Sequence, residues 1–209
     1  MSFARYFAPL GLLLFLIGCA APGSAPRQEV PAPKAAPEKL DPKANPDSKE
    51  TRARYKSALE AMRRHRYAEA QQEFELLAKR FPKLAGPRLN LAIALRQQGK
   101  ADESIATLRP LTSGPAALPE ALNQLGVLLR EQGKFTEARD AYLAAIQLNP
   151  GLARAHLNLG ILFDLYLQEF AQAIDHYQRY QALLTKPDRR VSGWILDLRR
   201  RQNRKGTAK

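Results

Sequence analysis

The sequence predicts an all-α protein, a solenoid of about four helix–turn–helix repeats closed by a C-terminal capping helix. Two observations support this. From Thr51 onward a small residue recurs every 34 residues, and a large apolar residue follows each small one by four positions. The small residues are Ala70, Ser104 and Ala138, with Ala173 one residue late; the large ones are Phe74, Leu108, Tyr142 and Tyr177. Such a period indicates stacked helical hairpins that bury a continuous core between neighbours.

The residue types at these positions resemble the tetratricopeptide repeat. The clearest unit is 119–152, whose motif positions hold Leu122, Leu125, Gly126, Leu129, Phe135, Ala138, Tyr142, Ala145 and Pro150. Small residues let two helices approach closely, large ones fill the space between hairpins, and Pro150 ends the second helix because proline cannot continue the hydrogen-bond ladder. We therefore expect repeats at 51–84, 85–118, 119–152 and 153–187.

Three of the expected repeats depart from the pattern. The first has Ser57 where a large apolar residue is usual, and the second has Ala92 in place of glycine and Ser104 in place of alanine. The fourth is one residue longer, and we expect the insertion near 166–169. The resemblance predicts the fold strongly and says little about activity.

The last segment, 188–209, is predicted to be a capping helix and a basic tail. Val191, Trp194, Ile195 and Leu198 have helical spacing, and Trp194 is expected to plug the end of the solenoid. Residues 189–209 contain eight basic residues against Asp197, in a chain of net charge +13. The tail is centred on Arg199, Arg200, Arg201, Arg204 and Lys205. Such a tail can bind anionic lipids, acidic polymers or an acidic protein face, or can simply be solvated.

The N-terminal segment, 1–18, resembles a bacterial lipoprotein signal peptide. Arg5 precedes the apolar run Leu10–Ile17, and Gly18 precedes Cys19, the chain's single cysteine. The resemblance implies cleavage before Cys19 and attachment of a diacylglycerol and an N-acyl lipid there; no other cofactor is expected. The alternative is an ordinary signal peptide with an incidental cysteine. By the sorting rule of enteric bacteria, the absence of aspartate after Cys19 favours the periplasmic face of the outer membrane.

Between Cys19 and the repeats, segment 19–50 is predicted to be a tether. It is rich in proline and alanine, has balanced charges and lacks apolar periodicity. Such a composition buries too little apolar surface to fold and favours an extended spacer.

Catalytic and metal-binding motifs are not found in the sequence. His65, His156 and His176 do not form a metal-binding pair, and no nucleophile or phosphate-loop motif occurs. His156 occupies a bulky packing position of its repeat. The sequence therefore predicts a protein that is not an enzyme and that holds no metal.

The expected binding surface is the concave groove lined by the first helix of each repeat. Its sixth positions hold Lys56, Asn90, Gln124 and Asn158. The three amides resemble the asparagine ladder with which some tetratricopeptide domains hold an extended peptide by its backbone. The alternative is that these positions are solvated or bind neighbouring helices.

Three arginines are expected to join the groove and to favour an acidic or C-terminal carboxylate ligand: Arg96, Arg130 and Arg154. The carboxylate clamp of co-chaperone domains is matched only in part. Gln124, Arg154 and Asn158 fit its residue types, whereas Leu89 and Ile93 occupy its other two positions.

These features together predict a lipid-anchored adaptor that binds an envelope protein or extended peptide. The layout is similar to that of lipoproteins that assemble type IV pili or secretins and of lipoproteins that scaffold peptidoglycan hydrolases, with fewer repeats and a longer tether. The alternative is a module that binds exopolysaccharide, lipopolysaccharide or peptidoglycan through the basic tail. Export argues against nucleic acid as a partner, and pairing of two copies through an exposed edge stays open.

Overall fold

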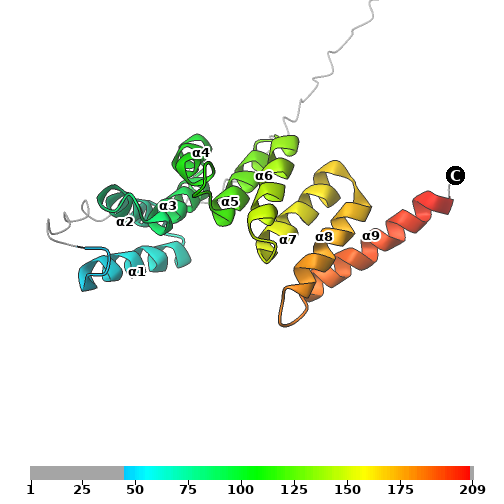
Figure 1. Ribbon diagram of the computed structural model, residues 1–209. Helices are drawn as coiled ribbons and strands as arrows, with labels where there is room; N and C mark the ends of the chain where they lie inside the picture. The colour runs from blue at the N-terminus through cyan, green and yellow to red at the C-terminus, as the bar shows by residue number, and fades with distance from the viewer. Residues whose placement is uncertain (1–44, 208–209) are drawn as a thin grey trace, which may run out of the picture. The chain divides into compact units, whose positions relative to one another are not determined.

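The computed structural model describes residues 45–207, and all regular structure within this range is helical (Figure 1). The elements are α1 (Lys49–Arg63), α2 (Tyr67–Arg80), α3 (Ala85–Gln97), α4 (Ala101–Leu108), the 3₁₀ turn η1 (Arg109–Leu111), α5 (Pro119–Glu131), α6 (Phe135–Leu148), α7 (Ala153–Ile161), the π-helical turn η2 (Leu162–Leu167), α8 (Phe170–Ala182) and α9 (Arg189–Thr207). The predicted fold class is confirmed. The predicted signal peptide, the lipidation site at Cys19 and most of the predicted tether lie outside the described residues.

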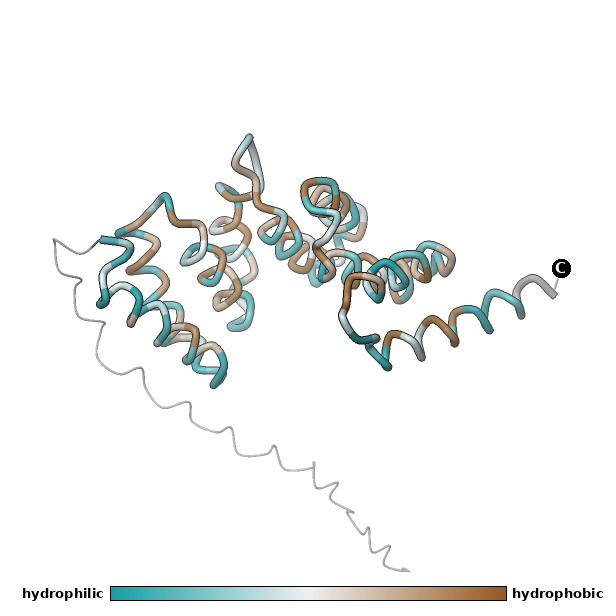
Figure 2. The backbone as a smooth tube through the Cα atoms, turned by 60° about the horizontal axis from the view of Figure 1, so that its bottom comes forward, coloured by the Kyte–Doolittle hydropathy of each residue, from teal (hydrophilic) through white to brown (hydrophobic). Residues whose placement is uncertain are grey.

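The helices pack as consecutive hairpins. The pairs α1–α2, α3–α4, α5–α6 and α7–α8 are in contact, each hairpin contacts the next, and α9 packs on α8. The core is accordingly a series of apolar clusters between neighbouring helices. Figure 2 shows apolar residues recurring along each helix between hydrophilic ones, as expected for helices that bury one face.

The turn inside each hairpin contains one residue in the left-handed region. Gly99 and Gly133 adopt φ of 78° and 76°, and His65 and Gln168 occupy the corresponding places with φ of 58° and 55°. Glycine adopts this conformation without a steric penalty, whereas a side chain makes it strained. The four hairpins therefore turn in the same way. The first and the fourth place a residue with a side chain, instead of glycine, in the left-handed conformation.

Two close helix contacts depend on glycine opposite tyrosine. A Cβ built on Gly126 would lie 2.5 Å from the Tyr142 ring, and one on Gly160 would lie 2.6 Å from the Tyr177 ring. In the second repeat Ala92 replaces the glycine, and the smaller Leu108 stands opposite in the same cluster. The larger Ala92 is thus accommodated because the residue opposite it, Leu108, is smaller than tyrosine.

The two irregular stretches have local causes. The second helix of the second repeat, α4, is short, because Pro110 follows it and the chain continues as a 3₁₀ turn. In the fourth repeat α7 widens into the π-helical turn η2, which accommodates an extra residue. The insertion expected near 166–169 is thus absorbed from Leu162 onward, ending at the left-handed Gln168.

The C-terminal helix α9 covers the last hairpin through Val191 and Leu198, each 1% exposed. Trp194 was expected to be the plug, and this is wrong: it is 39% exposed and lies beside Tyr177, with 5.5 Å between ring centroids. Each residue of a helix is rotated by about 100° from the one before it, so Trp194, three residues after Val191, is displaced sideways from the line that joins Val191 and Leu198. It therefore lies at the edge of the buried stripe. No helix within 45–207 is both long and apolar enough to cross a membrane.

The predicted basic tail begins within α9. Arg199 and Arg200 are exposed, and Arg201 forms an ion pair of 2.6 Å with Asp197 one turn earlier. The side chains of Arg204 and Lys205 lie outside the described part of the chain.

Candidate functional site: a basic groove across the repeats

The first helices of the second, third and fourth repeats border a cavity of about 380 Å³, here called the central groove. Five of the six predicted binding residues line it: Arg96, Gln124, Arg130, Arg154 and Asn158. The sixth, Asn90, lies outside it. Asn123, Val127, Glu131, Leu157 and Tyr180 complete the lining. Residues far apart in sequence meet here because α3, α5 and α7 stack side by side.

The charge of the groove is positive. Arg96 on α3 donates through Nη1 to Glu131 Oε1 on α5 at 2.7 Å, which links two repeats. The Arg130 guanidinium lies 5.8 Å from the centroid of the Tyr166 ring, a cation–π arrangement. No carboxylate among the described residues forms an ion pair with Arg130 or Arg154. Three guanidinium groups thus face one carboxylate.

Buried donors without acceptors lie at this site. The Nε atoms of Arg96 and Arg130 are buried without a hydrogen-bond partner in the described chain. The hydroxyl of Tyr142, which lies on α6 and does not line the groove, is likewise buried without a partner among these residues. Burial raises the pKa of Tyr142, and the charges of Arg130, Glu131 and Arg96 also act on it. A buried, unsatisfied polar group costs about 1–3 kcal/mol. An anionic group entering the groove would supply acceptors that the described residues do not provide.

The three amides at the sixth positions differ in their contacts. Asn158 Nδ2 donates to Asn123 Oδ1 at 2.9 Å, and Asn90 Nδ2 donates to the Tyr55 hydroxyl at 2.7 Å. Both hydrogen bonds join residues 35 apart, from one repeat to the preceding one. Gln124 has the apolar Leu89 at the corresponding place, and its amide has no partner in the part of the chain described. Gln124 is therefore the amide most available to a ligand, and the ladder stays a prediction.

A pair of histidines joins α7 to α8. His156 Nε2 lies 3.2 Å from the carbonyl oxygen of Pro150, and its Nδ1 lies 3.1 Å from His176 Nδ1. Because the carbonyl can only accept, His156 donates through Nε2 and accepts through Nδ1 from His176. Burial lowers the pKa of His156, and burial followed by repulsion from His156 lowers the pKa of His176 to about 4. The pair is a neutral packing contact; within 45–207 no three His, Cys, Asp or Glu side chains cluster to hold a metal.

Sequence reasoning missed two contributors to the groove. Glu131 was not singled out, although it stands 35 residues after Arg96, the same separation as the two amide contacts. Asn123 was not singled out, although it occupies the fifth position, next to the predicted Gln124. Pairing sixth-position residues with fifth-position residues of the preceding repeat could have found Asn123.

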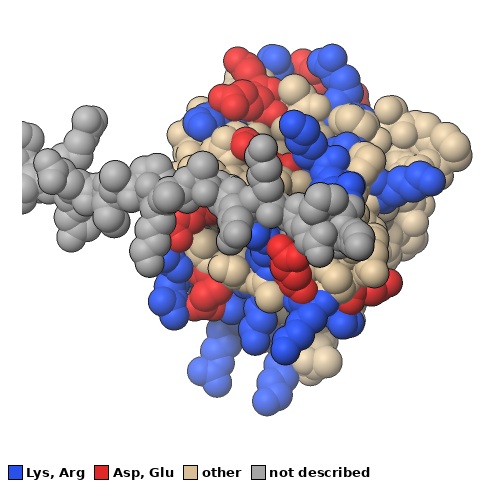
Figure 3. Space-filling view, turned by 90° about the vertical axis from the view of Figure 1, so that its left-hand side faces the viewer, with Lys and Arg blue, Asp and Glu red and all other residues tan. Residues whose placement is uncertain are grey.

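Basic residues are also prominent outside the groove. Figure 3 looks onto the end of the molecule that carries α1 and α2, where Lys and Arg side chains are numerous and gather along the lower edge of the view. Acidic residues are interspersed there; Arg63 and Arg64 bind Glu60 and hold the pKa of its carboxyl below the usual value. The positive charge is thus not confined to the tail.

Two sequence models of the tetratricopeptide repeat match this chain, one over residues 55–117 and the other over residues 126–165. No curated protein matches its sequence. Among solved structures, PilF of Pseudomonas aeruginosa is similar with a TM-score of 0.64 at 22% identity, over 73% of this chain and 69% of PilF.

MamA of Desulfovibrio magneticus RS-1, in a structure that starts at its residue 41, gives a TM-score of 0.59 at 17% identity, over 77% of this chain and 90% of that MamA chain. YrrB, described as a TPR protein with an unusual peptide-binding site, gives a TM-score of 0.54 at 20% identity, over 69% of this chain and 73% of YrrB. At these identities the likeness concerns the fold. The chain folds as an all-α tetratricopeptide-repeat solenoid, a scaffold type that commonly mediates protein–protein or peptide binding.

Proposed function

We propose that this protein is a non-enzymatic adaptor of the bacterial cell envelope, anchored by lipid at Cys19, which holds an acidic, extended segment of a partner protein in the central groove. The observation that carries the proposal is the set of arginine donors without acceptors in that groove. Arg130 and Arg154 have no carboxylate partner among the described residues, and buried Nε atoms of Arg96 and Arg130 lack an acceptor.

The chemistry of the groove suits a peptide carboxylate. A guanidinium binds a carboxylate through two parallel hydrogen bonds, which is stronger and more directional than a neutral contact. Gln124 adds a donor and an acceptor that can pair with one peptide unit of any sequence. YrrB, a similar fold, is described as having a peptide-binding site, which supports a peptide as the ligand class.

The envelope location rests on the N-terminal sequence. Cys19 follows a short apolar run and a glycine, in the pattern of a lipoprotein signal. One acyl chain holds a protein on a membrane only weakly, whereas two or more hold it stably. We expect wild-type protein in the membrane fraction and the Cys19→Ser variant outside it; a variant that remains in the membrane fraction would contradict the anchor.

The groove is tested with fluorescent peptides and the full-length chain in detergent. A glycine–serine peptide carrying paired glutamates should bind, and its glutamine counterpart should not. Arg130→Gln should weaken binding of the acidic peptide by about ten-fold or more, because a charged hydrogen bond contributes about 1.5–3 kcal/mol. Arg139→Gln is the matched control, since Arg139 lies outside the groove, beside Asp140 on α6.

Equal affinity for the acidic and the neutral peptide would refute the role of charge. Equal affinity of the Arg130→Gln and Arg139→Gln variants would refute the role of the groove. In the living bacterium, a photo-crosslinker at Gln124 should capture a partner that is no longer captured when Asn158 is replaced.

The exposed Arg199 and Arg200 on α9 favour one second candidate, binding of an anionic envelope polymer through the basic tail. The two candidates differ in their response to salt. Contacts between exposed charges are screened within about 10 Å at 0.1 M salt, so tail binding should weaken steeply on adding salt. Binding in the partly buried groove should persist in salt. If the groove is the binding site, a crosslinker at Gln124 should capture the partner and a crosslinker at Arg200 should not.

A further inference from the structure

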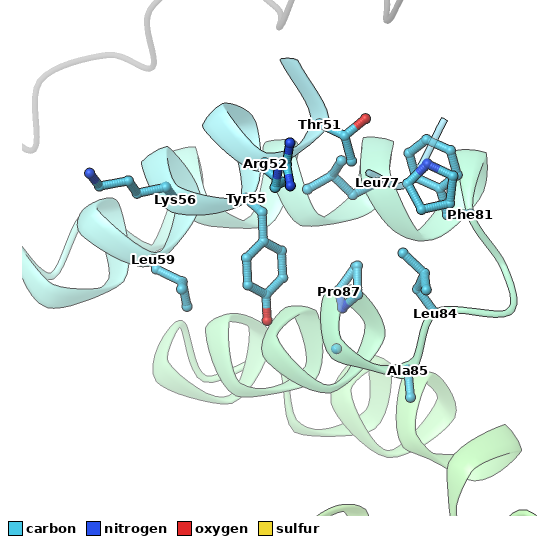
Figure 4. A pocket seen from close by; sticks show the side chains of 12 residues that line it. Thr51, Arg52, Tyr55, Lys56, Leu59, Leu77, Phe81, Leu84, Ala85 and Pro87 are labelled. Carbon is cyan, nitrogen blue, oxygen red and sulfur yellow. The ribbon is translucent and has the colours of Figure 1, made fainter. Parts of the chain in front are cut away.

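A second cavity, of about 350 Å³, opens between the N-terminal halves of α1 and α3; we call it the apolar pocket. Figure 4 shows side chains from α1, from the end of α2 and from the start of α3 converging around it. Its walls are mostly carbon: Tyr55, Leu59, Leu77, Phe81, Leu84 and Pro87. A cavity of this size and lining is typical of a site for an apolar group.

The apolar pocket continues the line of the central groove. Arg52, Tyr55, Lys56 and Leu59 occupy the second, fifth, sixth and ninth positions of the first repeat. In the third repeat the fifth, sixth and ninth positions line the central groove. The hydrogen bond from Asn90 to Tyr55 joins α3 to the wall of the pocket. The two cavities are thus successive parts of one face of the stacked first helices.

The rim of the pocket is basic. Arg52 and Lys56 are exposed and line it, and no acidic residue of the described range 45–207 does. Lys56 replaces the amide found at the sixth position of the other three repeats. An apolar side chain entering the pocket is therefore best accompanied by acidic neighbours, which would face these two cations.

The spacing between the two cavities follows from α3, which borders both. Pro87 and Arg96 lie nine residues apart on this helix, or about 14 Å along its axis. The cavities lie on opposite sides of α3, which adds a lateral step of about 8–10 Å, one helix spacing. An extended peptide advances about 3.3 Å per residue, so about five residues span this distance.

We propose that the apolar pocket is a second subsite of the groove, which takes one large apolar side chain of the partner segment. This side chain lies about five residues from the carboxylate that binds beside Arg96 in the central groove, and it is flanked by acidic residues that face Arg52 and Lys56. This proposal rests on the proposed function, because it assumes a peptide in the central groove. It assigns the ligand class more narrowly: an acidic segment with one apolar anchor.

The test compares peptides on the full-length chain in detergent. The reference peptide carries only the paired glutamates in a glycine–serine background. The anchored peptides carry in addition a leucine between two aspartates, five residues before or after the glutamates, and their controls replace that leucine with serine. We expect leucine in one of the two orders to tighten binding on the order of ten-fold relative to serine, from burial of its side chain.

A variant of the pocket wall then locates the gain. Leu84 is 38% exposed and occupies the N-cap of α3, where its side chain makes no capping bond. Serine is a favoured N-cap residue, so Leu84→Ser removes an apolar wall while it supports the helix. This variant should lose the leucine-dependent gain and keep its affinity for the reference peptide. Leu143→Ser, an exposed leucine on α6, is the matched control and should keep both.

The charge of the rim is tested separately. Lys56→Glu should weaken the anchored peptide with flanking aspartates and strengthen one with flanking lysines. If the Lys56→Glu variant still binds the peptide with flanking aspartates more tightly than the peptide with flanking lysines, the role of the basic rim is overturned.

The outcomes separate this proposal from the proposed function. If the reference peptide binds and leucine adds nothing in either order, the apolar subsite is overturned and the groove stands. If no acidic peptide binds, the proposed function fails, and this inference fails with it. In a further variant, residues 20–44 are replaced by glycine and serine. If leucine tightens peptide binding only in this variant, the chain's own segment 20–44 occupies the pocket in the wild type, and the proposal of a partner as the occupant is overturned.

Discussion

Replacing Tyr142 by phenylalanine should make the ligand-free protein more stable. Tyr142 is 0% exposed, and its hydroxyl has no hydrogen-bond partner in the described part of the chain. Burying a hydroxyl without a partner costs about 1–3 kcal/mol, and phenylalanine keeps the ring that packs on Gly126. We expect Tyr142→Phe to raise the free energy of unfolding by about 1 kcal/mol.

The fourth repeat supplies the control. Tyr177 stands at the equivalent position and is 1% exposed, but its hydroxyl donates to Asp164 Oδ2 at 3.2 Å. Tyr177→Phe removes that bond and leaves the carboxylate, whose pKa burial already raises, without this donor. A hydrogen bond to a charged group contributes about 1.5–3 kcal/mol; because Asp164 is only partly buried, we expect a loss of about 1–2 kcal/mol. The same chemical change thus has opposite signs at two equivalent positions.

Urea and thermal unfolding followed by circular dichroism at pH 7 measure both effects. For a domain of this size each kcal/mol shifts the midpoint temperature by about 2–4 °C, so the two variants should differ by about 4–12 °C. Destabilisation of the Tyr142→Phe variant by as much as Tyr177→Phe would refute the reasoning, since the Tyr142 hydroxyl would then have a partner. An unchanged Tyr177→Phe variant would refute the importance of the Asp164 contact.

Three further predictions use the same unfolding assays. Gly126→Ala should cost about 1–3 kcal/mol, because its Cβ would lie 2.5 Å from a tyrosine ring; an unchanged midpoint would contradict that contact. Gln168→Gly should gain about 0.5–1 kcal/mol by relieving a φ of 55°, and a loss would show that its side chain stabilises the turn. Because the pKa of His176 falls from 6.5 to about 4 on folding, the unfolded chain binds its proton first. Stability should therefore be full above pH 6.5 and fall by about 1–2 kcal/mol towards pH 4, after allowance for solvent screening; His176→Gln should flatten this slope, and an identical slope would exclude the pair as its cause.

Much of the fold was predictable because it is local. The 34-residue period, the small residues opposite large ones and the turn glycines each act within one hairpin or between adjacent hairpins. The insertion in the fourth repeat was visible in the spacing, but the way the helix accommodates it was not. The extra residue is taken up by the π-helical turn Leu162–Leu167, which begins before the expected place, 166–169, and overlaps it. Trp194 was misplaced for a similar reason, because spacing alone does not decide which residue of an apolar stripe lies at its centre.

The candidate site was predictable by position and not by pairing. The repeat register placed Gln124, Asn158 and the arginines on the first helices, and five of the six predicted residues do line one cavity. That Asn90 and Asn158 donate to preceding repeats, while Gln124 does not, depends on residues 35 positions away. The apolar pocket at the first repeat was not foreseen, since its walls come from α1, the end of α2 and the start of α3.

The sequence by itself determined the helical hairpins, their order and the basic character of the chain, because periodicity and composition act at short range along the chain. Only the tertiary structure decided which polar atoms bind one another and which remain without a partner. Within residues 45–207, the Nε atoms of Arg96 and Arg130 and the hydroxyl of Tyr142 have no hydrogen-bond partner. The reason is where neighbouring repeats place their side chains, which depends on packing between helices rather than on the residues of any one repeat.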